Sequence, residues 1–264
     1  MGLTLRTFAD VGEAGAALAA AGARYLGGGT LLVRQANEGD LSFSTYVRST
    51  DPSLSTITVE GGRARLGASV TMAAVARHRD LAFLAPVAKA VGGPAIRNMA
   101  TVGGNLFVPS PYGDFAVALL ALDAAISVGG TEFPIGQFLA ERESHSREIV
   151  TAVSFALPAA GAFRFRKVSR VKPKGASVVT IAALLGEEGD AVTSARIALG
   201  AMADRPIRAE AAERALIGRP LTKDGVAPAL AAAAEGTDPP TDAIASAWYR
   251  REVLPVHLGR LLIG

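Results

Sequence analysis

Two glycine-rich turns hold the residue types with the clearest chemical potential. The first has the sequence GGGT at residues 27–30, and the second has GGN at residues 103–105, shortly after Thr101. Glycine permits positive φ angles and close backbone approach, so consecutive N–H groups can converge on an anion. Thr30, Thr101 and Asn105 add side-chain donors. A diphosphate has more oxygens than one turn can satisfy, so the pair predicts a shared diphosphate cradle.

Each turn taken alone is more typical of a plain strand-to-helix connection than of an anion site. Neither turn fits the G-x-G-x-x-G fingerprint, and the dipeptide Gly-Lys of the Walker A loop never occurs. A nucleotide bound here is therefore not expected to bind as in a Rossmann or P-loop protein. No G-x-S-x-G elbow occurs either, so a hydrolase is poorly supported.

Asp114 and Lys167 are the ionisable candidates. Asp114 stands at the expected start of a helix, either as an acceptor for a ribose or ribityl hydroxyl or as a carboxylate stabilised by the helix dipole. In the alternating segment 163–168, Lys167 shares a strand face with Phe163 and Phe165. If the phenylalanines point inward, Lys167 needs an anionic or strongly accepting partner. The alternative is a lysine that extends to solvent at the strand end.

A basic cluster surrounds this lysine and permits two interpretations, a nucleic-acid contact or a solvated edge. Its members are Arg164, Arg166, Lys167, Arg170, Lys172 and Lys174. The formal charge of the chain is only +3, which does not favour nucleic acid. The three histidines, His78, His145 and His257, have no metal-ligand spacing, so no metal site is predicted.

Composition limits the class of protein. The chain has 264 residues, 50% of them hydrophobic and 19% charged, which excludes a disordered chain. It has no cysteine, which excludes disulfides, a cysteine nucleophile and an iron–sulfur cluster held by this chain. No signal peptide and no membrane-spanning run of apolar residues is evident, so a cytoplasmic location is expected.

The secondary-structure elements that must position these residues alternate between strand and helix at the start of the chain, whereas towards its end the strands come first and the helices follow. Strands at 3–5 and 25–26 and helices at 10–21 and 31–38 form an α/β opening, which a hairpin at 57–60 and 63–67 follows. The expected boundary lies at residues 158–161. Beyond it we expect strands and then helices, at 163–168, 178–185, 195–201, 208–216, 225–234 and 243–262, the last interrupted at Pro255.

The two turns, with their neighbours, resemble a known family. The segment GGGTLL at 27–32 is similar to its A-G-G-T-[DN]-L signature, and TVGGNLFVPSPYGD at 101–114 is similar to its T-[IV]-G-G-N and S-P-x-x-D signatures. The segments FRKVSR at 165–170 and YRREVLPVHLGRLL at 249–262 continue the resemblance. The sequence thus resembles the FAD-binding medium subunit of the molybdenum hydroxylases, the carbon monoxide dehydrogenase and xanthine dehydrogenase flavoprotein family.

The resemblance implies an α+β fold in two domains. A two-part FAD-binding domain of the vanillyl-alcohol-oxidase (PCMH) type would span residues 1–157, with subdomains at about 1–53 and 54–157. A smaller α+β C-terminal domain of the carbon monoxide dehydrogenase flavoprotein type would span residues 161–264. The cofactor-binding residues it implies are Gly27, Gly28, Gly29, Thr30, Leu31, Leu32, Val91, Thr101, Val102, Gly103, Gly104, Asn105, Asp114, Val150 and Lys167.

The implied roles differ among these residues. The two turns would hold the FAD diphosphate, and Asp114 would contact the adenosine or ribityl side. Val91 and Val150 would pack near the cofactor, and Lys167 would lie by the flavin ring, where a cation raises the reduction potential. No residue is expected to act as a catalytic acid or base.

The function implied is that of an oxidoreductase subunit that transfers electrons. Electrons would enter from a [2Fe–2S] small subunit, fed by a molybdopterin-binding large subunit, and leave to an external acceptor: NAD, quinone or oxygen. Two departures stand out, Leu31 in place of a polar residue and RVKPKGAS at 170–177 in place of an acidic-containing stretch. The alternatives are a stand-alone flavin oxidoreductase of the related fold, a scaffolding subunit with a weakened FAD site, and a nucleic-acid-binding protein.

Overall fold

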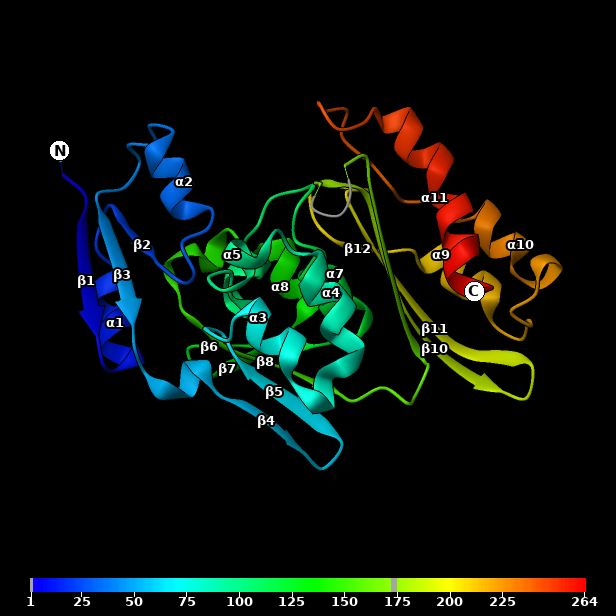
Figure 1. Ribbon diagram of the computed structural model, residues 1–264, viewed down its shortest axis with the longest axis horizontal. Helices are drawn as coiled ribbons and strands as arrows, with labels where there is room; N and C mark the ends of the chain where they lie inside the picture. Colours follow the sequence, from blue (N-terminus) through cyan, green and yellow to red (C-terminus); the bar gives the residue numbers. More distant parts are fainter. Residues whose placement is uncertain (1, 172–174) are drawn as a thin grey trace. The chain divides into compact units, whose positions relative to one another are not determined.

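The computed structural model describes residues 2–171 and 175–264, which form two compact units. The first unit contains the described residues up to Val108 together with Ala124–Ala156. The second contains Pro109–Asp123 and Leu157–Gly264. Lys172 and Lys174 of the basic cluster, and part of the departing segment 170–177, lie outside the described residues. Figure 1 labels the elements of both units.

A small parallel sheet opens the first unit. Its strands are β1 (Thr4–Phe8), β3 (Thr45–Ser49) and β2 (Ala23–Tyr25), in that spatial order. Helix α1 (Val11–Leu18) begins at Asp10, whose Oδ1 accepts the Glu13 N–H at 2.9 Å. The helix buries Leu18 against Val47 of the central strand. The first glycine turn follows β2 directly and ends at α2 (Leu32–Asn37).

A five-stranded antiparallel sheet completes the first unit. Its spatial order is β4 (Ile57–Glu60), β5 (Arg63–Gly67), β8 (Val150–Ala156), β6 (Ala125–Val128) and β7 (Thr131–Pro134). The β4–β5 hairpin has the predicted bounds, and its turn is Gly61-Gly62 with φ of 55° and 73°. The 3₁₀ segments of this unit are η1 (Pro52–Ser55), η2 (Arg79–Leu84) and η3 (Ser144–Arg147).

Short helices lie beside this sheet, with α3 (Met72–Arg77) and α4 (Ala85–Ala90) next to one another in front of it in Figure 1. Two further short helices follow along the chain, α5 (Pro94–Arg97) and α6 (Val102–Leu106). Helix α6 packs on β5 and β8, and α8 (Ile135–Glu141) packs on β6 and β7. The second glycine turn is therefore the first turn of a helix that lies on the sheet.

The second unit is a four-stranded antiparallel sheet with helices on both faces. Its order is β12 (Ile207–Arg208), β11 (Ala191–Gly200), β10 (Ser177–Glu188) and β9 (Phe163–Ser169). Helix α7 (Asp114–Ala121) packs on β10 and β11, and α9 (Glu210–Leu216), α10 (Lys223–Ala231) and α11 (Ala247–Leu262) belong to this unit's core cluster. A methyl group at Gly200 would lie 2.6 Å from Val117 Cγ2, so this glycine admits α7 closely.

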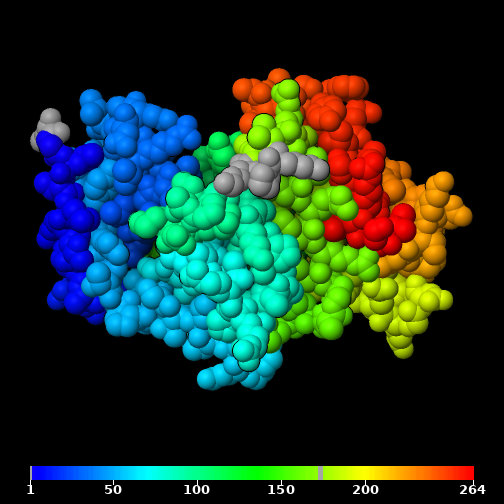
Figure 2. All heavy atoms as spheres, in the orientation of Figure 1, coloured from blue at the N-terminus to red at the C-terminus, as the bar shows by residue number. Residues whose placement is uncertain are grey.

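Two sequence expectations about the C-terminal helices need correction. Helix α11 begins at Ala247 rather than at 243, because Ser246 Oγ accepts the Tyr249 N–H at 3.2 Å and caps the helix. Pro255 lies inside α11 without ending it. The helix is exposed along its outer side, in orange and red in Figure 2. In the part of the chain that the structure describes, no helix combines the length and apolarity needed to cross a membrane.

Candidate functional site

The two glycine turns lie against one another in the first unit. A methyl group at Gly28 would lie 1.7 Å from the Met99 carbonyl oxygen, and one at Gly27 would lie 3.1 Å from Thr101 Oγ1. Real Cβ atoms do not approach backbone oxygen so closely, so only glycine fits at position 28. The backbone of the first turn therefore passes directly over the segment that leads into the second turn, as the cradle interpretation expected.

The first turn presents unpaired backbone donors. Residues 27–31 are half-buried, and Gly29 adopts a φ of +70°. Among the described residues, no acceptor is found for the N–H groups of residues 27–31, although Gly29 O accepts from Val33 N at 3.0 Å. Buried backbone N–H groups are almost always paired, so a half-buried run without partners favours an external acceptor. The turn is suited to bind an anion such as a diphosphate.

The second turn differs from the expectation in one respect. All four of its N–H groups are already bonded within the chain: those of Val102, Gly103, Gly104 and Asn105 donate to Val70 O, Ala68 O, Thr101 Oγ1 and Thr101 O at 2.9, 2.8, 3.1 and 3.0 Å. These N–H groups are therefore not free, as a second backbone nest would require, because α6 itself and residues 68–70 after β5 already accept from them. The second turn can still support the first turn by packing, because Met99 lies against Gly28 and Thr101 lies against Gly27. The side chains of Thr101 and Asn105 are both buried.

The departure at Leu31 has a local consequence. Leu31 occupies the N-cap position of α2, where a polar side chain normally accepts an N–H from the first helical turn. A leucine side chain has no acceptor, so this helix begins without a side-chain cap. Helix α2 has six residues and none of them is buried. The first turn is therefore followed by a short helix that gains little stability from packing.

The remaining apolar candidates of the first unit occupy different elements. Val91 follows α4 as its C-cap, and Val150 begins β8 and is buried in the five-stranded sheet. Leu32 is the first residue of α2. Their place beside a cofactor stays a prediction.

Asp114 and Lys167 meet within the second unit. Lys167 Nζ donates to Asp114 Oδ2 at 2.6 Å, and the two side chains are only 11% and 6% exposed. Ser177 and Thr180, both buried on β10, donate to Asp114 Oδ1 at 2.8 and 2.5 Å. The strand-face argument is confirmed in that Lys167 points to a buried carboxylate rather than to solvent. The same carboxylate was predicted to accept from a sugar hydroxyl, and it already has three donors from its own chain.

The basic cluster around Lys167 is largely engaged inside the second unit. Arg164 donates to the carbonyl oxygens of Leu261 and Leu262, and Arg166 donates to Arg260 O at 3.4 Å. Cations at the carbonyl end of α11 are favoured by its dipole. Arg170 donates to Ile244 O at 3.4 Å. These contacts explain the arginines of β9 without a nucleic-acid partner.

One polar cluster was missed by sequence reasoning. His145, nearly buried in the first unit, has its Nδ1 2.5 Å from Glu148 Oε2 and its ring stacked 5.1 Å from Phe138. The i, i+3 spacing with Glu148 could have indicated it. No group of three or more His, Cys, Asp or Glu side chains suited to a metal ion occurs in residues 2–171 and 175–264.

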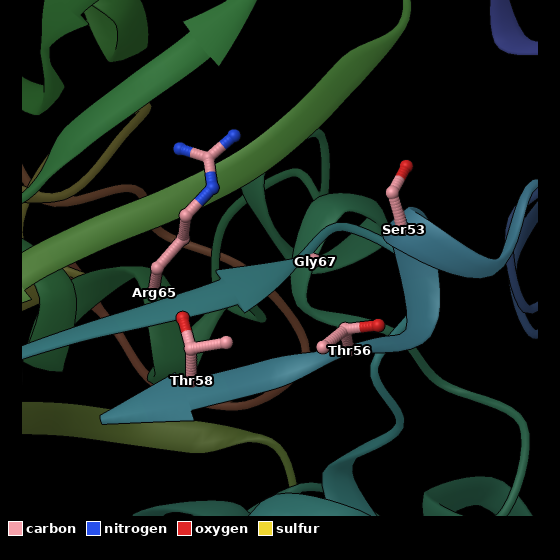
Figure 3. Close-up of a pocket in the computed structure, with 5 residues that line it drawn as sticks. All are labelled: Ser53, Thr56, Thr58, Arg65 and Gly67. Carbon is pink, nitrogen blue, oxygen red and sulfur yellow. The ribbon is translucent and has the colours of Figure 1, made fainter. Parts of the chain in front are cut away.

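A small open pocket also lies outside the predicted site. Its volume is about 200 Å³, and its lining residues are Ser53, Thr56, Thr58, Arg65 and Gly67. Figure 3 shows these side chains on β4, β5 and the preceding 3₁₀ segment, with the Arg65 guanidinium extended over the neighbouring strand. Arg65 donates to Ser127 Oγ at 3.3 Å, which accounts for that direction. None of the predicted cofactor-binding residues lines this pocket.

Two family models together match most of the chain, and both describe parts of flavin-containing dehydrogenases. Residues 5–159 match the family model described as FAD binding domain in molybdopterin dehydrogenase. Residues 164–263 match the model described as CO dehydrogenase flavoprotein C-terminal domain. The chain therefore belongs to the molybdopterin dehydrogenase FAD-binding family, and the predicted family, the fold class and the cofactor FAD are confirmed.

Similar proteins include oxidoreductase subunits. The chain is 33% identical over 138 residues to the nicotinate dehydrogenase FAD-subunit of Eubacterium barkeri, a match that spans 47% of each protein. Reconstituted CO dehydrogenase from Oligotropha carboxidovorans matches with a TM-score of 0.89, 26% identity and coverage of 99% of this chain and 96% of that one. CO dehydrogenase from Hydrogenophaga pseudoflava shares the fold, with a TM-score of 0.91, 24% identity and the same coverage.

Proposed function

We propose that this chain is the FAD-binding electron-transfer subunit of a molybdenum hydroxylase complex. A [2Fe–2S] partner subunit supplies the electrons, a molybdopterin-binding subunit oxidises the substrate, and an external acceptor (NAD, quinone or oxygen) receives them. The single observation that supports FAD binding most directly is the run of N–H groups at residues 27–31, for which the described part of the chain offers no acceptor. The absence of cysteine from the sequence agrees with iron–sulfur clusters held by a partner. A cytoplasmic location is part of the same proposal.

The first turn would bind the FAD diphosphate through its backbone. Each charge-assisted hydrogen bond from these N–H groups would contribute about 1.5–3 kcal/mol. Gly28 allows the turn to lie on the Met99 carbonyl, and Thr101 lies beside Gly27, so the second turn would hold the first in shape. FAD would supply an acceptor that takes up and releases one or two electrons. The chain would bind and orient it without a catalytic acid or base.

The experiment that tests the proposal is a titration of the purified chain with FAD and with FMN, which lacks the diphosphate. Binding is followed by calorimetry and by the visible spectrum of the bound flavin. We expect one FAD per chain and much weaker binding of FMN. A chain that shows no flavin absorbance after incubation with FAD and gel filtration would contradict the proposal.

A second candidate function rests on Leu31. Since α2 lacks a side-chain cap, the chain could keep the fold as a scaffolding subunit whose FAD site is weakened. The same titration separates the two candidates, because a scaffolding subunit would form the complex without retaining FAD. A stand-alone flavin oxidoreductase would instead oxidise a small substrate as the isolated chain, which the proposed subunit would not do.

A further inference from the structure

We propose that the exposed face of α11 binds the same face of a second copy of this chain, with the two helices antiparallel about a two-fold axis at Val256. The face consists of five exposed residues, named here the α11 stripe: Tyr249, Glu252, Val256, Arg260 and Ile263. It lies wholly within the second unit, and Figure 2 shows α11 at the surface in orange and red. The pairing goes beyond the proposed function, because it needs neither FAD nor another kind of subunit.

The apolar members of the α11 stripe recur every seven residues. Tyr249, Val256 and Ile263 are 45%, 50% and 47% exposed. Seven residues make almost two turns of a helix with about 3.6 residues per turn, so these three side chains lie along one line. Leu254 and Leu258 are buried on the other side of α11, against the core of the second unit. Exposed apolar residues are ordinary when scattered, but a continuous apolar surface marks an interaction site.

Two opposite charges lie among these apolar residues. Glu252 and Arg260 are both exposed, and within residues 2–171 and 175–264 neither side chain has an ion-pair or hydrogen-bond partner. They are eight residues apart, which is about 12 Å along the helix axis, so they do not pair with each other. The neighbouring Arg251 differs, because it lies 3.8 Å from the carboxylate of Asp238.

An antiparallel pair of α11 helices satisfies all of these residues at once. With the two-fold axis at Val256, each residue before Val256 faces the residue equally far after it in the second copy. Tyr249 is seven residues before and Ile263 seven after, so they face one another across the axis. Glu252 is four residues before and Arg260 four after, so the carboxylate of one copy faces the guanidinium of the other. The symmetry makes each of these contacts twice.

A parallel arrangement of the same two helices is disfavoured by charge. It would place Glu252 beside Glu252 of the second copy and Arg260 beside Arg260 of the second copy, and like charges at an interface cost free energy. The order of charges along the α11 stripe therefore selects the antiparallel arrangement. It also selects a second copy as the occupant, because the stripe is complementary to itself.

Trp248 extends the apolar surface beside Tyr249. It is the only tryptophan of the chain, and it is 67% exposed. Tryptophan, tyrosine and arginine are the residues most enriched among those that dominate protein interfaces. A single pair of helices covers less than the roughly 1,600 Å² of a standard interface. We therefore expect a reversible dimer that dissociates on dilution.

The test is sedimentation velocity of the full chain over a range of concentrations, from about 1 to about 200 µM, where small interfaces associate. We expect the wild-type chain to change from monomer to dimer over this range. Quenching of Trp248 fluorescence by iodide, measured on the same samples, should decrease as the dimer forms. A chain that stays monomeric throughout, or a dimer in which Trp248 is quenched as in the monomer, overturns the proposal.

Charge reversal tests the antiparallel register. Glu252→Arg and Arg260→Glu should each weaken the dimer at least tenfold, because each change creates two contacts between like charges. The double variant should restore the wild-type affinity, since opposite charges face one another again. This rescue requires the second copy, because positions 252 and 260 are too far apart to pair within one helix.

Arg251→Glu is the matched control. It makes the same change of charge on the same helix, but residue 251 lies outside the α11 stripe, so the affinity of the dimer should be unchanged. All of the substituted residues are exposed, and unfolding temperatures check that each variant is folded. A dimer that the single reversals leave intact, or that the double variant does not restore, would place the contact on another surface and overturn the proposal.

Discussion

The carbonyl oxygen of Met99 occupies the space that a side chain on Gly28 would need, at 1.7 Å from a methyl group placed there. This approach joins two turns that are about seventy residues apart in the sequence. It explains why the first turn needs glycine at that position. It also means that changes in either turn should affect the other.

Gly28→Ala should therefore weaken FAD binding at least tenfold, because the turn must move off Met99 and its N–H groups lose their arrangement. Calorimetric titration with FAD measures the change. Gly15→Ala is the matched control, because Gly15 lies in α1 and a methyl group there meets no atom within 4 Å. Equal affinities for FAD in the two variants would show that the contact with Met99 does not shape the binding turn.

Leu31→Asn should strengthen the site. Asparagine at an N-cap accepts an N–H from the first helical turn, which stabilises a helix by about 1 kcal/mol. We expect a higher unfolding temperature and tighter FAD binding than in the wild-type chain. Leu31→Ala, which adds no acceptor, serves as the control. If the asparagine variant is no more stable than the alanine variant, the missing N-cap does not destabilise α2 and the prediction is contradicted.

Asp242 should make the second unit sensitive to acid. Burial tends to raise the pKa of Asp242, but the N–H groups of Ala245 and Ile244 and the Arg250 guanidinium outweigh it and lower the pKa below 3.8. Arg250 is fully buried and forms a two-point contact with this carboxylate at 2.9 and 2.8 Å.

A lowered folded-state pKa gives stability that is present above the unfolded pKa and lost as the pH falls through the folded one. Urea unfolding between about pH 5 and pH 2 measures this loss of folding free energy. Asp242→Asn should be less stable at pH 5 and show a smaller further loss in acid. An unchanged acid profile in Asp242→Asn would assign the loss to other carboxylates.

Arg164 should matter for stability rather than for nucleic-acid binding. Its guanidinium bonds the last carbonyl groups of α11, and hydrogen bonds to charged groups contribute about 1.5–3 kcal/mol. Arg164→Met should therefore lower the free energy of unfolding by an amount of that order. Arg214→Met is the control, because Arg214 and Glu210 form an exposed pair whose contribution is about 0–1 kcal/mol. Salt-dependent binding of DNA or RNA by the wild-type chain would contradict this assignment.

Local pattern predicted the parts of the fold that depend on neighbouring residues. The β4–β5 hairpin follows from its glycine pair, and the face that Lys167 shares with Phe165 follows from strand alternation. The hydrogen-bond partners of the candidate residues could not be predicted in this way, because they lie on segments far away in the sequence. The N–H groups of Val102 and Gly103 are taken by carbonyl groups more than thirty residues earlier in the sequence, and Arg164 bonds a helix end almost a hundred residues away. No periodicity in either segment contains that information.

The most direct test of the account is hydrogen exchange of the backbone amides with and without FAD. Among residues 2–171 and 175–264, the N–H groups of residues 27–31 have no acceptor, whereas the N–H groups of residues 102–105 are already bonded. We predict that FAD slows exchange strongly at 27–31 and changes it little at 102–105. Bound FAD that leaves exchange at residues 27–31 unchanged would contradict the claim that this turn holds the diphosphate.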